Sequence, residues 1–527
     1  MRGPQFSRDF LIKWVALLGF VAAAGCGGSS EIPANSTPNF TGITLKIGAL
    51  GDPAILAGAK LQRGEWVASR AGALEFGEKG VEIPELSSVD VLLFPGERMG
   101  DLIDAGVLAA IPRSAVVVTP KVDNLDVDVP QAADESEQSK GSNDLVESFQ
   151  YNDIAPAFRD QVAKYGDELV ALPYGGSALV LIYRQDAFRK EANQKAAQEA
   201  GLTLEPPKTW KDFEILARFF QGRDWDGDGK PDHGVSLALG EDSDGLANSI
   251  YLARAAASGL HRDYYSFLFD ADSMAPRLTT PPFVEALASL ASLSKCGPPG
   301  MEKFDASAAR AAFRDGHTAM LIDRAERVST WTTGKPTGIA PLPGSSRVYD
   351  PAQKAWQDVS TPNAPSYLPI GGGWLIGVRH GLDKARLEAA IDFARFLADP
   401  ENSNRVRAER SFAMLPFRIS QMGQGMPDPT SAPDVDVRLW SDSVSRTLMA
   451  VKVVPGLRIP EAGGYLADLT QGRLAALQGE SPEKALEKVA ANWASRTAAF
   501  GPKRMAWHYR RSLNSLATGS EPPPKGQ

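Results

Sequence analysis

Two long apolar segments that are interrupted by glycines constrain the fold of this chain most strongly. The first runs from Ala171 to Phe188 with the sequence ALPYGGSALVLIYRQDAF, and the second runs from Tyr367 to Val378 with the sequence YLPIGGGWLIGV. Strands that are buried on both faces have continuous apolar sequences, whereas half-exposed strands alternate apolar and polar residues. We therefore predict two buried strands, each broken by its glycines.

The segments near the start of the folded chain predict the fold class. An apolar stretch at Leu45–Leu50 is followed by a helical stretch through Arg70 and by a second apolar stretch at Val89–Phe94. A strand, a helix and a strand at this spacing are typical of an α/β domain with a parallel sheet. Further along, Thr209 and Asp212 have the spacing of a capping box and predict the start of a helix.

The first 26 residues have the layout of an export signal. Basic residues precede an apolar run from Trp14 to Ala24, and small residues then lead to Cys26. The run is too short for a membrane span, which needs ~20 apolar residues. A cysteine in this place resembles the bacterial lipobox, which implies cleavage after residue 25 and a lipid on Cys26; the alternative is an ordinary signal peptide with an incidental cysteine. Residues 26–41 are polar and predict a flexible tether.

Composition excludes two classes of protein. The 527 residues carry a formal net charge of -8, and nucleic-acid binding needs a basic surface, so we expect no nucleic-acid partner. The only cysteines are Cys26 and Cys296. With Cys26 used for lipid attachment, no disulfide framework is possible, and Cys296 is expected to be a buried apolar residue.

Motifs for enzymatic chemistry are missing. None of the five histidines stands in an HExxH pair. The segment from Gly175 to Leu179 begins like a nucleophile elbow but lacks its closing glycine, and Gly229-Lys230 is followed by proline instead of the Ser or Thr of a P-loop. We therefore expect no enzyme and no redox or nucleotide cofactor.

The sharpest motif is the acidic loop DWDGDGKPD, Asp224 to Asp232. Its aspartates match the first nine positions of a calcium loop and let carboxylate oxygens converge on one ion; they are Asp224, Asp226, Asp228 and Asp232. The twelfth position is Val235, where a calcium loop has a bidentate glutamate, so the missing ligand would come from elsewhere, for example Glu241. The alternative is a solvated acidic turn. Either role would be structural.

Five segments in a shared order carry a family resemblance. They are DVLLFPGERMGDLIDAGVLAAI, ALPYGGSALVLIYRQDAF, AAFRDGHTAML, the second glycine-rich strand with its following DFARFLADPE, and RIPEAGGYLADLTQGRLAALQGESPEKALEKVAANW. In order and spacing the chain is similar to the extracellular solute-binding proteins that include maltose-binding protein. The resemblance extends from about Ile43 to Gly501.

The resemblance implies a two-lobed α/β fold, the type II periplasmic-binding-protein fold, with a ligand cleft between the lobes. The two glycine-broken segments would be the strands that cross between lobes, and their glycines would serve as hinges or, alternatively, only relieve packing; they are Gly175, Gly176, Gly371, Gly372 and Gly373. Lobe 1 would comprise residues 42–172 and 379–430, lobe 2 would comprise 173–378 and 431–515, and 516–527 would be a disordered tail.

The resemblance also implies a ligand site. In open α/β sheets, ligands bind at the carboxyl ends of the strands, which favours Asp52 and the pair Glu97 and Arg98. Aromatic rings and paired polar groups suit a sugar. The alternative to ligand binding is a surface ion pair for Glu97 and Arg98, and packing in the core for the aromatic residues. The complete predicted set is Asp52, Glu97, Arg98, Tyr174, Ser177, Trp331, Trp374 and Tyr465.

One segment departs from the family pattern. Where the family often has a tryptophan platform, this chain has Asp323-Arg324-Ala325-Glu326, with Trp331 further on. This departure leaves room for a charged or smaller solute.

Together these features predict an extracytoplasmic, lipid-anchored receptor, at the periplasmic face or the cell surface. It would be a monomer that captures a small solute, a sugar or oligosaccharide, and delivers it to the permease of an ABC transporter. A lipoprotein of the same fold that acts as a sensor or adhesion partner is the second reading, and a surface hydrolase is the third.

Overall fold

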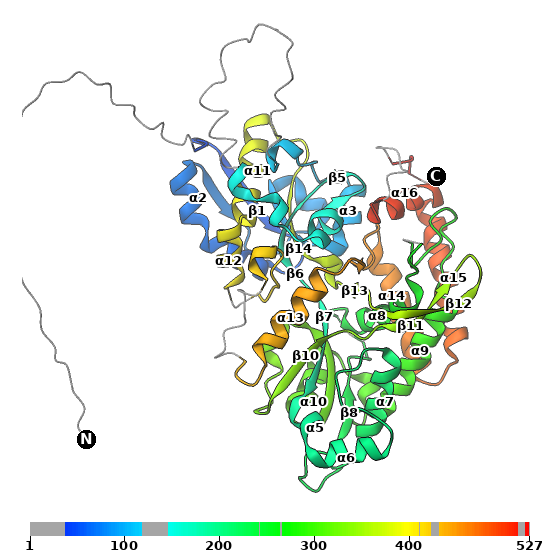
Figure 1. The fold of residues 1–527 in the computed structure, drawn as a ribbon. Helices are drawn as coiled ribbons and strands as arrows, with labels where there is room; N and C mark the ends of the chain where they lie inside the picture. The colour runs from blue at the N-terminus through cyan, green and yellow to red at the C-terminus, as the bar shows by residue number, and fades with distance from the viewer. Residues whose placement is uncertain are drawn as a thin grey trace, which may run out of the picture.

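We describe the computed structural model over residues 37–117, 146–241, 243–263, 266–409, 412–422, 432–514 and 522–525. The predicted signal segment, Cys26 and most of the tether lie outside these residues, as does most of the predicted tail. Figure 1 shows the chain folded into two lobes, one above the other in this view.

The first lobe is built on a five-stranded sheet with the order β2-β1-β3-β14-β6. Strands β1 and β2 are parallel, as are β1 and β3, whereas β14 runs antiparallel to both β3 and β6. The predicted parallel arrangement is thus confirmed for β1 and β3, whereas the sheet as a whole is mixed. The strands are β1 (Thr44–Ala49), β2 (Ala73–Phe76), β3 (Val91–Pro95), β6 (Leu172–Gly176) and β14 (Gly373–Val378).

Helices surround the first sheet and bury its apolar side chains. Trp66 is fully buried, and its indole N–H donates to Asp392, 2.9 Å away. This bond satisfies the single polar atom of a large core residue. The helices are α1 (Leu56–Leu61), α2 (Arg63–Arg70), α3 (Met99–Asp104), α11 (Lys384–Ala398) and α12 (Pro400–Arg407).

The second lobe is built on a four-stranded sheet with the order β10-β7-β9-β8. Strand β7 pairs antiparallel with β9 and β10, and β8 is parallel to β9. All residues of β7 and β9 are buried, as their continuous apolar sequences predict. The strands are β7 (Leu179–Arg184), β8 (His233–Ser236), β9 (Thr318–Arg324) and β10 (Thr337–Pro341).

Helices of the second lobe begin where the sequence predicts. Thr209 and Asp212 form the expected capping box, with the Asp212 N–H 3.1 Å from the Thr209 hydroxyl. The helices of this part of the chain are α5 (Gln185–Arg189), α6 (Glu191–Glu199), α7 (Trp210–Phe220), α8 (Leu246–Gly259), α9 (Pro281–Leu293), α10 (Ala306–Arg314), α13 (Val437–Leu448), α14 (Ala462–Leu477), α15 (Pro482–Phe500) and α16 (Pro502–Ser512).

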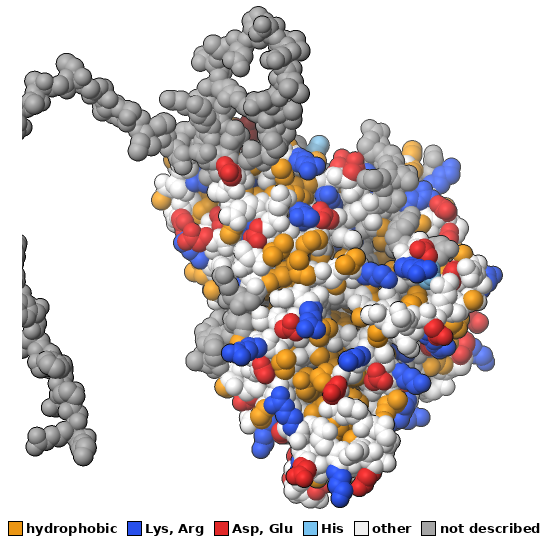
Figure 2. Space-filling model, viewed as in Figure 1, with side chains coloured by type: hydrophobic (Ala, Val, Ile, Leu, Met, Phe, Trp, Pro, Cys, Tyr) orange, Lys and Arg blue, Asp and Glu red, His pale blue; other side chains and the backbone are white. Residues whose placement is uncertain are grey.

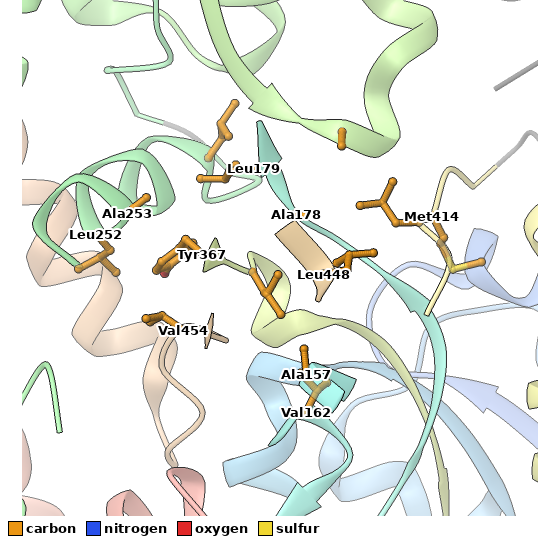
Figure 3. Packing of buried hydrophobic residues seen from close by; sticks show 14 of the residues in the cluster. Ala157, Val162, Ala178, Leu179, Leu252, Ala253, Tyr367, Met414, Leu448 and Val454 are labelled. Carbon is orange, nitrogen blue, oxygen red and sulfur yellow. The ribbon is translucent and has the colours of Figure 1, made fainter. Parts of the chain in front are cut away.

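Three two-stranded sheets complete the fold. They are β4 (Lys164–Tyr165) with β5 (Glu168–Leu169), β11 (Ser345–Asp350) with β12 (Ala355–Asn363), and β13 (Ser366–Tyr367) with β15 (Val453–Val454). Near β13, Figure 3 shows Tyr367 between Leu252 and Ala253 of α8 on one side and Val454 on the other. Figure 2 shows acidic and basic side chains interspersed over the face in view.

The chain crosses between the two sheets at both glycine-containing segments. Strand β6 ends at Gly176 in the first sheet, and β7 starts at Leu179 in the second. The return crossing leads from β13 to β14, and the Ser177 N–H donates to the Gly372 carbonyl at 3.2 Å, which joins the two crossings.

The sheets place two segments differently from the predicted lobe boundaries. Residues 373–378 and 173–176 were assigned to lobe 2, but they form β14 and most of β6 in the sheet of the first lobe. Hydrogen bonding to β3 holds β14 there, and only the tertiary structure specifies that pairing.

Helix α16 also packs against the first lobe, although residues 431–515 were assigned to lobe 2. Its His508 and Arg504 lie 3.0 Å and 2.6 Å from the Asp104 carboxylate at the end of α3. The last described helix therefore connects the lobes.

Candidate functional site

A polar cavity of about 790 Å³ lies where the two lobes meet. The first lobe contributes Glu97, the return crossing contributes Ile370 and Gly371, and the second lobe contributes the other groups. The polar side chains among its lining residues are Glu97, Glu241, Ser243, Asp244, Asn248, Ser249, Asp305, Ser307, Arg310, Tyr367, Thr470 and Gln471.

The N-terminal ends of two helices position several of these groups. Helix α8 begins after Gly245, whose φ of 73° is left-handed, and brings Asn248 and Ser249 to the cavity in its first turn. Helix α10 begins at Asp305, whose carboxylate accepts the Ala308 N–H at 2.7 Å. Because helix N-termini carry partial positive charge, both helices favour an acceptor-rich ligand at this place.

Hydrogen bonds between helices fix the Asn248 side chain. Its amide donates to the Leu466 carbonyl at 3.0 Å and to the Thr470 hydroxyl at 2.9 Å, both on α14. The Arg473 Nε donates to the side-chain amide oxygen of Asn248 at 3.3 Å. Such a network holds a polar wall rigid before a ligand arrives.

Ion pairs hold the charged groups on the second lobe. The Arg310 guanidinium binds Asp323 in a bidentate manner at 2.6 Å and 2.9 Å and lies 3.8 Å from Asp244. Arg324 is buried and lies 3.2 Å from the same Asp244 carboxylate. The segment that departs from the family pattern thus supplies a charged cluster beside the cavity.

Glu97 is the charged group of the first lobe in the cavity. Burial raises the pKa of its carboxyl, while Arg324 and then Arg98 act in the opposite direction. Tyr367 also lines the cavity. Burial raises the pKa of its phenol and the Glu97 charge raises it further, so Tyr367 keeps its proton and can donate it in a hydrogen bond.

The sequence profile of bacterial extracellular solute-binding proteins matches residues 81–418, more than half of the chain. The chain belongs to this family. No curated protein matches the sequence. No helix within the described ranges has the length and apolar character needed to cross a membrane.

Several solved structures of binding proteins share the fold at low identity. An ABC transporter solute-binding protein from Agrobacterium radiobacter K84, in complex with ribitol, is 18% identical, with a TM-score of 0.58 over 87% of this chain and 100% of that one. The cyclic alpha-maltosyl-1,6-maltose binding protein from Arthrobacter globiformis is 16% identical, with a TM-score of 0.57 over 86% and 98%. A solute-binding protein from Agrobacterium vitis S4, with bound D-mannitol, is 18% identical, with a TM-score of 0.54 over 86% and 98%.

Of the residues predicted from the family resemblance to bind ligand, Glu97 lines the cavity. Its neighbour Arg98 pairs with Asp101 at 2.7 Å. Asp52 is exposed, and its carboxylate accepts the Ala54 N–H at 2.9 Å, where it caps a short turn after β1. Neither Arg98 nor Asp52 is among the lining residues, although both follow first-lobe strands as predicted.

The predicted aromatic residues lie in or against the core of this family member. Tyr465 is fully buried; its ring contacts Phe269 and Trp493, and its hydroxyl lies 3.0 Å from that of Thr497. Trp331 is fully buried and donates to Asp323 at 2.8 Å. For both residues the structure corrects the prediction of a cleft position, because their polar atoms already have partners inside the second lobe.

Three further predicted residues lie at the crossings but do not line the cavity. Tyr174 is buried and donates to the Ile55 carbonyl at 3.1 Å. Ser177 is buried and donates to Glu326 at 2.5 Å. Trp374 is partly buried, with its ring edge against Phe412 at 4.9 Å between centroids. The structure places these side chains in packing and hydrogen bonding between neighbouring segments.

The predicted hinge glycines fall into two structural groups. The φ angles of Gly371, Gly372 and Gly373 are 66°, 103° and 129°. Residues other than glycine rarely adopt such angles. In contrast, a Cβ on Gly175 would lie 2.3 Å from the Met414 sulfur. The first group supplies unusual backbone angles at the return crossing, and Gly175 relieves close packing. Rotation at either place stays a prediction.

The acidic loop folds around its own backbone. The Asp224 carboxylate accepts the N–H groups of Gly227 and Gly229, at 2.7 Å and 3.0 Å. The buried Asp232 carboxylate accepts two further loop N–H groups and lies 3.0 Å from the His317 imidazole. Oxygens of Asp224, Asp226 and Asp232 lie within 4.8 Å of one another.

Neither Val235 nor Glu241 supplies the missing ligand of the predicted calcium loop. Val235 is buried in β8, and Glu241 lines the cleft cavity. The group that joins the acidic cluster is His317, near Asp226 and Asp228. Calcium prefers oxygen ligands, so the three aspartates fit the ion and the imidazole does not.

Sequence reasoning missed most of the cavity wall. Asp244, Asn248 and Ser249 lie in the stretch EDSDGLANS, a polar loop that leads into a helix. Asp305 lies six residues before AAFRDGHTAML, the segment that carried part of the family resemblance. An N-cap aspartate and a glycine before a helix were the available signals. They indicate helix starts, but not that two such starts face one cavity.

Proposed function

We propose that this member of the family is a lipid-anchored receptor that binds a small polyhydroxylated solute, a sugar or sugar alcohol, between its lobes and presents it to an ABC importer. The cavity between the lobes carries the proposal. Carboxylates line it from both lobes, and hydroxyls, two amides and a guanidinium line it from the second lobe. Such groups bind neighbouring hydroxyls in pairs.

The lining favours a small solute over a long oligosaccharide. Tyr367 is the only aromatic residue among the described residues that line the cavity, so a row of sugar rings has few flat surfaces to cover it. Ribitol and D-mannitol, the solutes bound in two of the similar structures, are linear polyols that need hydroxyl partners and no ring platform.

The proposed role is binding without chemical conversion. The similar structures are those of binding proteins. Closure of the lobes around the solute would create the form that the importer recognises.

A thermal-shift screen tests this function. The mature protein is mixed with pentitols, hexitols, monosaccharides and maltodextrins, and a bound solute at a hundredfold excess over its Kd stabilises the folded state by about 2.7 kcal/mol. We expect the strongest shift from a polyol or monosaccharide that is recovered unchanged. Conversion of the hit into products would instead identify a hydrolase, and no shift with any of these compounds would contradict the proposed ligand class.

A further inference from the structure

The second lobe contains another cavity, of about 480 Å³, that the cleft function does not use. It is enclosed by α7, α8, α9 and β11, which lie together in the second lobe in Figure 1. Arg254 and Ser258, near the end of α8, face this cavity, whereas the first turn of the same helix faces the cleft. Within the described ranges the two cavities share no lining residue.

Three buried hydrogen-bond donors on its wall have no acceptor among the described residues. They are the Trp210 indole N–H, the Arg254 Nε–H and the Ser258 hydroxyl. Trp210 and Ser258 are 1% and 2% exposed. Buried donors in native proteins almost always have a partner, because an unpaired donor has lost its water without compensation. Three lining residues of one cavity with such donors favour a bound acceptor at this place.

The carboxylates of this cavity are already engaged. One Glu214 oxygen accepts the Ser289 hydroxyl at 2.5 Å, and the other lies 3.3 Å from Arg218. Glu285 binds Arg347 through two contacts of 2.8 Å and 2.9 Å. The wall therefore offers donors in excess of acceptors.

The cationic side chains of the lining also favour an anion in this cavity. Arg254 lies over the Trp210 ring, and its nearest carboxylate oxygen, on Glu214, is 3.7 Å away. Burial lowers the pKa of Arg254, and the attraction of Glu214 and Glu285 does not restore it. The exposed Lys211 lines the same cavity. An anion at this place would gain from both cations.

We propose that this cavity is a second binding site, for a small oxyanion such as a carboxylate or a phosphate group. Its oxygens would accept hydrogen bonds from Trp210, Arg254 and Ser258. The proposal stands independently of the solute in the cleft.

Isothermal titration calorimetry with the mature protein tests the site. The probes are inorganic phosphate, sulfate and citrate, each titrated at constant ionic strength against a chloride background. We expect saturable binding of at least one of them. A preference for citrate would indicate a carboxylate ligand, and a preference for phosphate and sulfate would indicate a phosphate group.

Two variants assign the binding to this cavity. Trp210→Phe removes one N–H and keeps an aromatic ring, so it should weaken binding about fivefold, and Arg254→Gln removes the charge and should weaken it about tenfold or more. Trp374→Phe and Arg446→Gln make the same changes at residues that do not line this cavity, and they should bind like the wild type. Ser258→Ala replaces Arg254→Gln if the latter does not fold.

The absence of saturable binding of all three anions would overturn the proposal, since water would then be the partner of the donors. Equal affinities in the wild type, Trp210→Phe and Ser258→Ala would overturn it as well. A cooperative thermal unfolding transition, measured on the same samples without anion, confirms that each variant is folded.

Discussion

At the scale of single residues, Glu97 brings the only charged side chain of the first lobe into the cleft cavity, within the described residues. Glu97→Gln keeps its size but removes the charge that accepts hydrogen bonds from solute hydroxyls. We expect the Kd of the solute to rise by about five- to 150-fold, which corresponds to about 1 to 3 kcal/mol. Calorimetry on the apo protein and the solute found by screening measures this change.

Glu75→Gln is the matched control for Glu97→Gln, because Glu75 is an exposed residue of β2 in the same lobe. It should bind the solute with unchanged affinity. Equal affinities of the two variants would show that the solute does not reach Glu97 and that the site lies elsewhere in the cleft.

Calcium binding by the acidic loop stays a prediction at the residue scale, and we propose a direct test. If an ion joins Asp224, Asp226 and Asp232, a chelator should lower the Tm of the wild type, and Asp226→Asn should remove this sensitivity. A wild-type Tm that does not respond to chelator would identify the loop as a turn that its backbone hydrogen bonds hold alone.

At the scale of elements, the return crossing depends on Gly371. Its φ is 66°, and a Cβ at this position would lie 2.1 Å from the Glu97 backbone nitrogen. Gly371→Ala should therefore lower the free energy of unfolding by about 2 kcal/mol or more, and displace Glu97 in the cavity. Urea unfolding at neutral pH measures the loss.

Gly64→Ala provides the contrast to Gly371→Ala. Gly64 lies inside α2, and a Cβ there would meet no atom within 4 Å. Alanine should stabilise this helix by about 0.5 to 1 kcal/mol. A similar change in the free energy of unfolding of the two variants would mean that the backbone of the return crossing accommodates a side chain at position 371 without strain.

The contact between α16 and α3 predicts a pH-dependent stability. Burial works to raise the pKa of Asp104, but hydrogen bonds from His508 and Arg504 and their charges outweigh it, so the pKa is lowered from 3.8. A lowered folded-state pKa means that the stabilisation is present above the unfolded value and is lost as the pH falls through the folded value.

Asp104→Asn should therefore be less stable than the wild type at pH 7, by about 1 to 3 kcal/mol. The difference should shrink as the pH falls below about 4, because the carboxyl then binds a proton in the unfolded wild type and, at lower pH, in the folded wild type as well. Urea unfolding of both proteins between pH 7 and pH 3 measures it. A difference that is constant over this range would contradict the assigned ion pair.

At the scale of the whole molecule, a lipid anchor would decide where the protein acts. Lipid attachment at Cys26 is a proposal that rests on the sequence, and Cys26 lies outside the described residues. We expect Cys26→Ser to move the protein from the membrane fraction to the soluble fraction. Cys296→Ser is the control; Cys296 is buried in the second lobe, so this variant should stay in the membrane fraction. Unchanged fractionation of Cys26→Ser would contradict the anchor.

Sequence by itself determined the local structure and the class of the fold. Continuous apolar runs at 179–184 and 373–378 became buried strands, and the spacing of Thr209 and Asp212 produced the capping box. These features depend on neighbours in sequence: side-chain periodicity fixes which face is buried, and a cap bonds within three residues. The order of apolar and glycine-rich segments was sufficient to indicate the family.

Tertiary structure alone decided which polar residues share the cleft. Asp244, Asp305 and Glu97 lie far apart in the chain and meet only because two helix starts and the loop after β3 face one cavity. It also decided that Tyr465 and Trp331 are core residues, since an aromatic residue with a polar atom suits a binding site and a core equally well. Their partners, Thr497 and Asp323, are specified by packing between segments, which no local pattern records.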